Sequence, residues 1–240
     1  MKDLYISFPL SNQCVAVTTT TLLGNLAYQV DNGQNVFNNR EKLAKALGVS
    51  LDRFVFVHQS HSDKVMKITI NDLGKGKESF EDGMECDALY THEKNIPLGI
   101  FHADCVPIFF INEKASLVGI IHAGYKGTMK HVTYKVIKEI CENEHLSISD
   151  FGFYIGPFRQ PQSFMVDEYS KKEIIASGFE TAVSNDRFDN GLANKLDLYK
   201  LGVKDAQISS CDLDTVSDDR FYSAIQKTPV GRLVSLIYLK

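Results

Sequence analysis

Apolar residues recur every three to four positions in four stretches of the chain, which is the spacing of one helix face. This spacing predicts helices over residues 35–47, 126–143, 167–176 and 192–201. The first helix is expected to end before Gly48, because glycine favours the left-handed conformation that closes many helices. One apolar stripe, opposite a face of lysines, marks the second helix: Met129, Val132, Val136, Ile140 and Cys141.

Shorter apolar runs predict β-strands. Residues 54–58 and 65–69 are expected to pair around a short turn, and residues 71–85 form a polar, glycine-rich loop. The run 107–111 is apolar on both faces, which predicts a central strand covered on both sides. The remaining expected strands are 98–102, 106–111, 117–122, 151–155 and 232–239.

The order of these elements indicates the fold class. Strands occur in runs and do not alternate strictly with helices, so the pattern favours an α+β fold with mixed sheets over a doubly wound fold. The sequence contains no internal repeat, heptad run or low-complexity linker. A single domain over residues 1–240 is therefore the simplest interpretation.

Composition narrows the function classes. The net charge is −4 with 44% hydrophobic residues, which is typical of a globular protein and argues against a nucleic-acid partner. No apolar run reaches the roughly 18 residues of a membrane span, and the first residues lack the features of a signal peptide. The five cysteines are odd in number and widely spaced. We therefore expect a cytoplasmic protein with reduced thiols and no membrane partner.

Chemically versatile residues stand at the ends of three predicted strands. His61 lies in the turn after the first strand, Cys105 between two buried strands, and His122 before two glycines that lead into a helix. A thiolate and two imidazoles are good ligands for zinc or copper, and three ligands leave a fourth position open for water or substrate. The three segments together predict a catalytic metal site.

Other readings of these residues stay open. His58 and His102 compete for the ligand positions, although strand alternation allows at most one of His58 and His61 to join. Cys105 alone is more typical of a small buried hydrophobe. Cys105 and His122 would also suit a nucleophile and its base. The motif of zinc deaminases is absent.

Six further motifs stand out along the chain: Gln59-Ser-His61, Cys86-Asp-Ala-Leu-Tyr-Thr91, Ala103-Asp-Cys-Val-Pro107, His122-Ala-Gly-Tyr-Lys-Gly127, Ile155-Gly-Pro157 and Gly231-Arg-Leu-Val-Ser-Leu-Ile237. Together with Asn39-Arg40 in the first helix, they give the chain a resemblance to the laccase-domain family, also called multicopper polyphenol oxidases, whose members act as purine nucleoside phosphorylases. The resemblance covers nearly the whole chain, and the order Ala-Asp-Cys before His-Ala-Gly is specific.

The resemblance implies a fold, a site and an activity. The implied fold is an α+β sandwich of mixed β-sheets with helices on its outer faces. Zinc would be bound by His61, Cys105 and His122, and copper would occupy the same site in vitro. Arg40, with Lys126, would bind phosphate for attack on the ribose, so that Arg40, Cys105 and His122 form the catalytic set. The implied substrates are adenosine, inosine, guanosine and methylthioadenosine, with adenosine deamination as a second activity.

Some positions depart from the family pattern. Tyr125-Lys126 replaces the usual Trp-Arg, and lysine lacks the planar fork that grips phosphate at two points. Residues 18–24 replace a Thr-Arg-x-Gly-Gly segment, and Phe164-Met-Val166 lacks an acidic side chain of the family. These changes leave the metal ligands intact and affect the expected substrate preference.

Three rival functions remain. A copper-dependent polyphenol oxidase would need more histidines than the seven present, and the chain has no His-x-His pair. A metal-free hydrolase would use Cys105 and His122 directly. A binding protein would recognise a metabolite without turnover.

Overall fold

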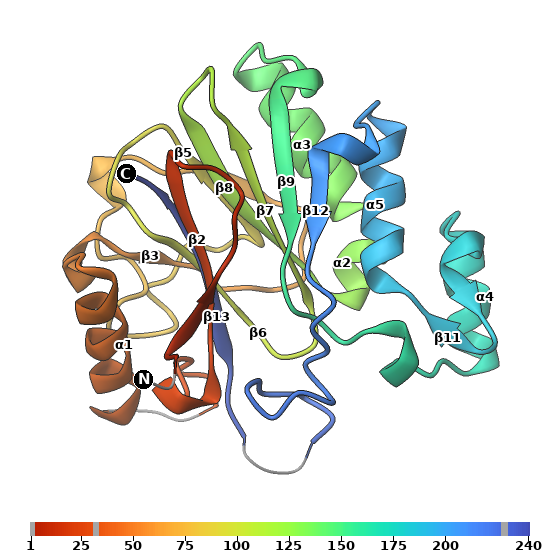
Figure 1. Cartoon of the computed structure of the whole chain (residues 1–240), viewed down its shortest axis with the longest axis horizontal. Helices are drawn as coiled ribbons and strands as arrows, with labels where there is room; N and C mark the ends of the chain where they lie inside the picture. The colour runs from red at the N-terminus through yellow and green to blue at the C-terminus, as the bar shows by residue number, and fades with distance from the viewer. Residues whose placement is uncertain (1–2, 31–33, 227–229) are drawn as a thin grey trace.

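Two mixed β-sheets form the centre of the molecule in the computed structural model, which describes residues 3–30, 34–226 and 230–240 (Figure 1). The first sheet has the strand order β1-β2-β13-β6-β3, and only β3 and β6 run parallel. β13, the last strand of the chain, lies between β2 and β6. The strands of the first sheet are β1 (Tyr5–Ser7), β2 (Cys14–Thr19), β3 (Val55–Phe56), β6 (Leu98–His102) and β13 (Leu233–Leu239).

The second sheet has the order β12-β9-β7-β8-β5-β4. Its two outer pairs, β12 with β9 and β4 with β5, are parallel, and its inner pairs are antiparallel. The strands are β4 (Val65–Lys67), β5 (Ala88–Thr91), β7 (Val106–Asn112), β8 (Leu117–Ala123), β9 (Phe151–Ile155) and β12 (Ile208–Ser210).

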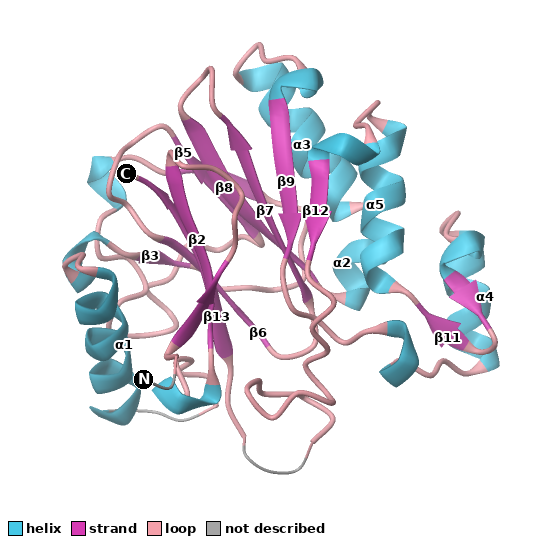
Figure 2. Cartoon of the chain, viewed as in Figure 1, coloured by secondary structure: helices cyan, strands magenta, loops and turns pink. Residues whose placement is uncertain are grey.

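In the part of the chain that the structure describes, five α-helices and a small hairpin surround the sheets (Figure 2). α3 and α5 pack on one face of the second sheet, and α1 lies at the opposite end of the molecule (Figure 1). α4 packs with the hairpin in a separate small cluster of apolar side chains. The bounds are α1 (Gln34–Leu47), α2 (Tyr125–Met129), α3 (Val132–Asn143), α4 (Glu168–Ala176), α5 (Asn190–Lys200), β10 (Val183–Ser184) and β11 (Arg187–Phe188).

The alternation of side chains in β7 explains why the molecule is layered. Phe109 and Ile111 belong to the core between the two sheets, whereas Ile108 and Phe110 face the core under α3 and α5. Because successive side chains of a strand point to opposite faces, a run that is apolar throughout needs cover on both sides. The prediction of a central, fully covered strand is confirmed, as is the α+β class with mixed sheets.

Two predictions about local structure are wrong. The expected hairpin of residues 54–58 and 65–69 does not form, because β3 joins the first sheet and β4 the second. The expected single helix over residues 126–143 is two helices, α2 and α3, separated at His131, whose φ of 60° is left-handed. The segment between β3 and β4 contains His61, and Lys130, next to the break at His131, donates a hydrogen bond to the carbonyl oxygen of His61 at 3.1 Å.

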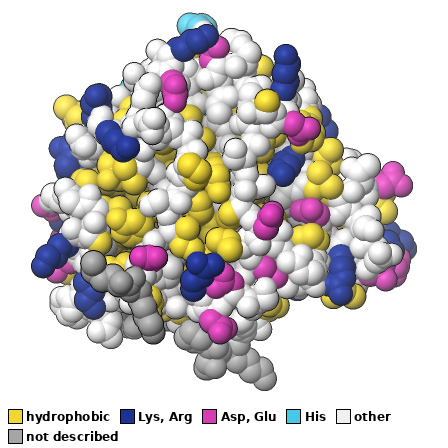
Figure 3. Space-filling view, viewed as in Figure 1, with side chains coloured by type: hydrophobic (Ala, Val, Ile, Leu, Met, Phe, Trp, Pro, Cys, Tyr) yellow, Lys and Arg dark blue, Asp and Glu magenta, His cyan; other side chains and the backbone are white. Residues whose placement is uncertain are grey.

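The outer surface fits the composition. Acidic and basic side chains are interspersed around a hydrophobic middle on the face shown in Figure 3. Among the described residues, no helix is long and apolar enough to cross a membrane.

Candidate metal centre

His61, Cys105 and His122 converge from three different loops and strand ends. His61 follows β3 with a left-handed φ of 56°, Cys105 lies in the turn between β6 and β7, and His122 is near the end of β8. One possible ligand atom from each residue lies within 4.8 Å of the other two. Among the described residues, these three are the histidine, cysteine or acidic side chains that lie close enough together to hold one metal ion. The structure thus brings together the three residues expected from the sequence.

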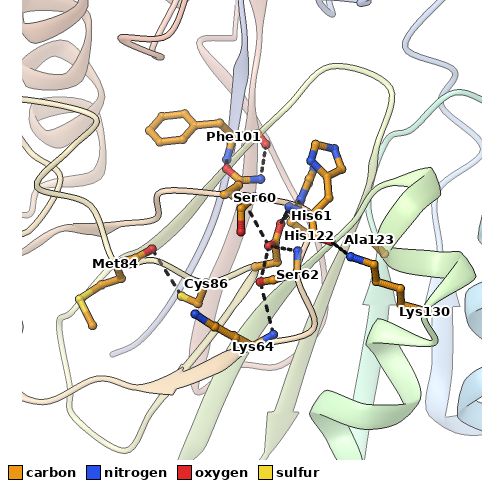
Figure 4. Close-up of polar contacts among 12 residues, drawn as sticks. Ser60, His61, Ser62, Lys64, Met84, Cys86, Phe101, His122, Ala123 and Lys130 are labelled. Atoms are coloured by element: carbon orange, nitrogen blue, oxygen red, sulfur yellow. Dashed lines mark hydrogen bonds and ion pairs between the residues drawn. The ribbon is translucent and has the colours of Figure 1, made fainter.

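A buried carboxylate, that of Asp87, orients two of the three residues. Its Oδ1 accepts a hydrogen bond from His122 Nδ1 at 2.9 Å, which leaves Nε2 of that imidazole for the cluster. Figure 4 shows His122 together with His61 and Ser62. The same carboxylate accepts bonds from the backbone N–H of His61 at 3.2 Å and of Ser62 at 2.6 Å. Ligand imidazoles are commonly fixed in this way by a carboxylate. Asp87 therefore holds both His122 and the His61 turn.

Charge in the cluster favours a thiolate. Burial alone would raise the pKa of Cys105, but the charge of His122 and hydrogen bonds from His122 and His61 outweigh it and lower the pKa to about 6. Burial opposes protonation of His122, yet the Cys105 thiolate and Asp87 raise its pKa to about 9. A metal ion binds the thiolate form and takes the place of the protons. The donor set therefore fits a soft or borderline cation such as zinc or copper.

Gly124 keeps open the space beside these ligands. A Cβ atom at this position would lie 2.8 Å from Cδ2 of His61 and 3.0 Å from Sγ of Cys105. Any larger residue would displace both side chains. This close approach explains the glycine that directly follows His122-Ala123.

The three residues open onto a cavity of about 320 Å³, here called the metal cavity. Arg232 is its cationic side chain among the described residues, and no described carboxylate lines it. Gln59 also lines it, but its amide is occupied by both the N–H and the C=O of Phe101 at 2.8 Å. The remaining lining residues are Gln29, Phe101, His102, Ala103 and Ala224.

The neighbour of Cys105, Asp104, ties the cavity wall to the metal residues. Asp104 has a φ of 85°, and its carboxylate accepts hydrogen bonds from Thr215 Oγ1 at 2.7 Å, Ser223 Oγ at 3.0 Å and Ala224 N at 2.8 Å. Ala224 is a lining residue of the metal cavity. One turn therefore positions both Cys105 and part of the wall.

Arg40 is not among the residues that line the metal cavity. Its side chain is 1% exposed, and it donates to the carbonyl oxygens of Leu26 at 2.8 Å, Lys77 at 3.0 Å and Gly76. Its guanidinium also packs over the rings of Phe56 and Phe101. Nε and Nη1 of Arg40 are thus occupied by backbone carbonyls, and the phosphate-binding role expected of Arg40 stays a prediction.

The other expected residues occupy different positions. Lys126 is exposed on α2 and does not line the metal cavity. His58 packs against Phe80 with ring centroids 3.8 Å apart, away from the cluster. His102 is 2% exposed, and its Nε2 lies 2.8 Å from Ser235 Oγ. Burial lowers the pKa of His102 to about 3, which the backbone of Cys105 only partly opposes.

Gln29 and Arg232, which line the metal cavity, were not among the site residues expected from the sequence. Arg232 stands in the terminal Gly-Arg-Leu motif, which was a usable signal. Gln29 lies in an irregular segment before α1 without any motif of its own. No pattern in the sequence could have indicated it.

Fold and site together define a class of two-sheet α+β proteins with a His-Cys-His centre. A family model described as multi-copper polyphenol oxidoreductase laccase matches residues 18–240. The chain belongs to this laccase-domain family.

Relatives and solved structures agree with this assignment. Purine nucleoside phosphorylase YlmD of Bacillus subtilis is 31% identical over 100% of this chain and 90% of its own length. Purine nucleoside phosphorylase Cj1217c of Campylobacter jejuni is 30% identical, covering 88% of this chain and 89% of its own. The crystal structure of YlmD from Geobacillus stearothermophilus has a TM-score of 0.91 at 27% identity, covering 100% and 97% of the two chains.

Proposed function

We propose that this protein is a zinc-dependent purine nucleoside phosphorylase acting on adenosine, inosine, guanosine and methylthioadenosine. The observation that carries the proposal is the convergence of His61, Cys105 and His122 at a cavity that also contains an arginine. The names of relatives at about 30% identity support the reaction class.

Phosphate is assigned to Arg232. A guanidinium suits a phosphate dianion because its planar fork donates two parallel hydrogen bonds. No described carboxylate of the metal cavity would repel the anion. Arg232 therefore takes the role that the family resemblance gave to Arg40.

The reaction needs positioning and charge stabilisation from the chain. A phosphate oxygen forms a bond to the anomeric carbon of the ribose while the bond from that carbon to the purine nitrogen breaks. The purine leaves with the electron pair of that bond and takes up a proton from solvent, and ribose 1-phosphate is the other product. Arg232 would hold the attacking phosphate, and the metal cavity would limit access of competing water. Bound zinc would supply a Lewis acid for oxygen atoms of the substrate.

The choice of zinc over copper rests on the expected chemistry. Phosphorolysis is not a redox reaction, and zinc has no redox activity under cellular conditions. Copper would bind the same donor set more tightly in vitro, because it stands above zinc in the affinity order of divalent metals. Adenosine deamination stays a prediction of the family resemblance.

We also propose that residues 1–240 form a single domain. One apolar core includes side chains from both sheets and from α1, such as Leu236, Ile120 and Leu43. Met1 and Lys2 lie outside the described residues.

The test is the conversion of inosine by the zinc-loaded protein with and without inorganic phosphate. We expect hypoxanthine and ribose 1-phosphate in equal amounts, and only when phosphate is present. Release of hypoxanthine with free ribose in the absence of phosphate would make the protein a hydrolase. Ammonia release from adenosine, measured in the same samples, tests deamination.

A further inference from the structure

A second cavity, of about 660 Å³, lies next to the metal cavity and is here called the aromatic cavity. Three half-buried rings line it: Tyr28 before α1, Phe37 on α1, and Phe80 in the loop that precedes β5. Its volume falls in the range of small-molecule sites, which are mostly apolar with a few polar groups. Neither the metal site nor the phosphate position uses this space.

The two cavities adjoin at Gln29, which lines both of them. Buried Arg40 forms a second link, because its guanidinium lies 4.5 Å from the ring centre of Tyr28 and 5.0 Å from that of Phe101. Tyr28 belongs to the aromatic cavity and Phe101 to the metal cavity. A ligand with two parts could therefore reach from one cavity to the other past Gln29.

The two cavities differ in the charge of the side chains that line them. Glu78 and Glu81 line the aromatic cavity, and no described lysine or arginine does so. The metal cavity has the opposite character, with Arg232 and no described carboxylate. Phosphate is thus favoured in the metal cavity and disfavoured in the aromatic one. A neutral ring system with N–H groups suits the aromatic cavity, because carboxylates and amide oxygens accept hydrogen bonds from such groups.

We propose that the aromatic cavity binds the purine base of the substrate, between Tyr28, Phe37 and Phe80, while ribose and phosphate lie in the metal cavity. This inference rests on the proposed function for the identity of the substrate. Bases stack on aromatic rings with little dependence on sequence, since every base has a π-face. Gln29 and Gln34 supply amide donors and acceptors for the edge of the base.

Fluorescence gives a test that does not depend on turnover. The chain contains no tryptophan, so Phe37→Trp introduces a single reporter into the aromatic cavity. We expect saturable quenching by inosine and by hypoxanthine in the absence of phosphate, and none by inorganic phosphate or ribose 5-phosphate. The matched control is Tyr169→Trp on α4, where the side chain is 79% exposed, and it should not respond.

Kinetics give the second test. We expect Tyr28→Leu and Phe80→Leu each to raise the KM for inosine about tenfold to a hundredfold, as for loss of a stacking ring. The KM for phosphate and the zinc content should stay normal, and Tyr28→Phe should restore a KM near that of the wild type. An unquenched Phe37→Trp, or inosine KM values within about twofold in both leucine variants, would overturn the inference. Absence of phosphorolysis in the wild type would instead refute the proposed function. The binding of the base could still be tested in that case, because quenching of Phe37→Trp by inosine does not depend on turnover.

Discussion

At the residue scale, the metal centre depends on one buried acid. Asp87 is fully buried and binds His122, Ser62 and the backbone of His61 through a single carboxylate. Burial would raise its pKa, but the hydrogen bonds from His122 and Ser62 lower it below the usual value. The acid is therefore ionised when it holds the imidazole of His122 and the backbone N–H of His61.

The first prediction concerns this acid. Asp87→Ala should weaken zinc binding about tenfold to a hundredfold, because the imidazole of His122 loses its fixed orientation. Titration with a competing zinc chelator measures the change. Asp63→Ala is the matched control, since the Asp63 side chain is 40% exposed and pairs with Lys135 at the surface. Equal zinc affinity in the two variants would show that Asp87 does not position the site.

The second prediction separates the two arginines. Arg40→Lys should lower the free energy of unfolding by about 2 kcal/mol, because carbonyl groups inside the protein lose their donors. The KM for phosphate should remain near the wild-type value in this variant. In contrast, Arg232→Ala should leave the free energy of unfolding near the wild-type value. It should raise the KM for phosphate at least about tenfold, for loss of a charge-assisted contact of about 1.5–3 kcal/mol. Denaturant unfolding and initial rates measure both effects. If Arg40→Lys raised the KM for phosphate and Arg232→Ala lowered the stability, phosphate binding would be assigned to Arg40.

The burial of Arg40 was readable from the sequence in retrospect. Arg40 follows Val36 by four positions and precedes Leu43 by three, so it lies on the apolar face of α1. The Asn39-Arg40 motif indicated a contact with a ligand, whereas the helical spacing indicated a side chain directed into the core. The convergence of His61, Cys105 and His122 was predictable because each is a versatile side chain at the end of an apolar strand.

At the scale of elements, the long apolar strands and most helices were predictable, but some strand partners were not, and β1, β2, β5 and β12 were not expected from the sequence. The bounds of β6 and β9 agree with the expected ones, because each is an apolar run ended by polar residues or Gly-Pro. The assignment of β3 and β4 to different sheets follows from long-range pairing that periodicity does not contain. The break at His131 depends on contacts too, since its Nδ1 bonds to Asp197 of α5 at 2.8 Å.

The third prediction concerns Glu144, at the end of α3. Its carboxylate accepts from Tyr90 at 2.8 Å and pairs with Lys67 at 2.8 Å, which connects the helix to β5 and β4. Burial would raise its pKa, but Lys67, Tyr90 and His92 lower it from 4.5 to about 2. Because the folded state holds the lower pKa, its contribution to stability is complete above about pH 4.5 and is lost as the pH falls towards 2.

Glu144→Gln should therefore be less stable than the wild type by about 1 kcal/mol at pH 7. The difference should narrow as unfolding is measured at successively lower pH below about 4.5. Glu142→Gln is a suitable control, because the ion pair of Glu142 with Lys138 is long, at 3.8 Å, and lies at the surface. A difference for Glu144→Gln that is constant from pH 7 to pH 3 would contradict the assigned pKa.

At the scale of the whole molecule, the site depends on segments that are far apart in the chain. β13, from the C-terminal end, supplies the middle of the first sheet and follows directly after Arg232. Gln29, from the N-terminal part, reaches the same cavity. The sequence predicted a terminal strand, but its central place results from pairing with β2 and β6. The family resemblance, which covers nearly the whole chain, predicted more of this arrangement than periodicity did.

The most direct measurement is the zinc content of the wild type and of His61→Ala, Cys105→Ala and His122→Ala, with inosine phosphorolysis measured on the same samples. We predict about one zinc per chain and phosphate-dependent activity in the wild type, and the loss of both in every variant. Full zinc content and activity in all three variants would contradict the assignment of these residues as the catalytic metal centre.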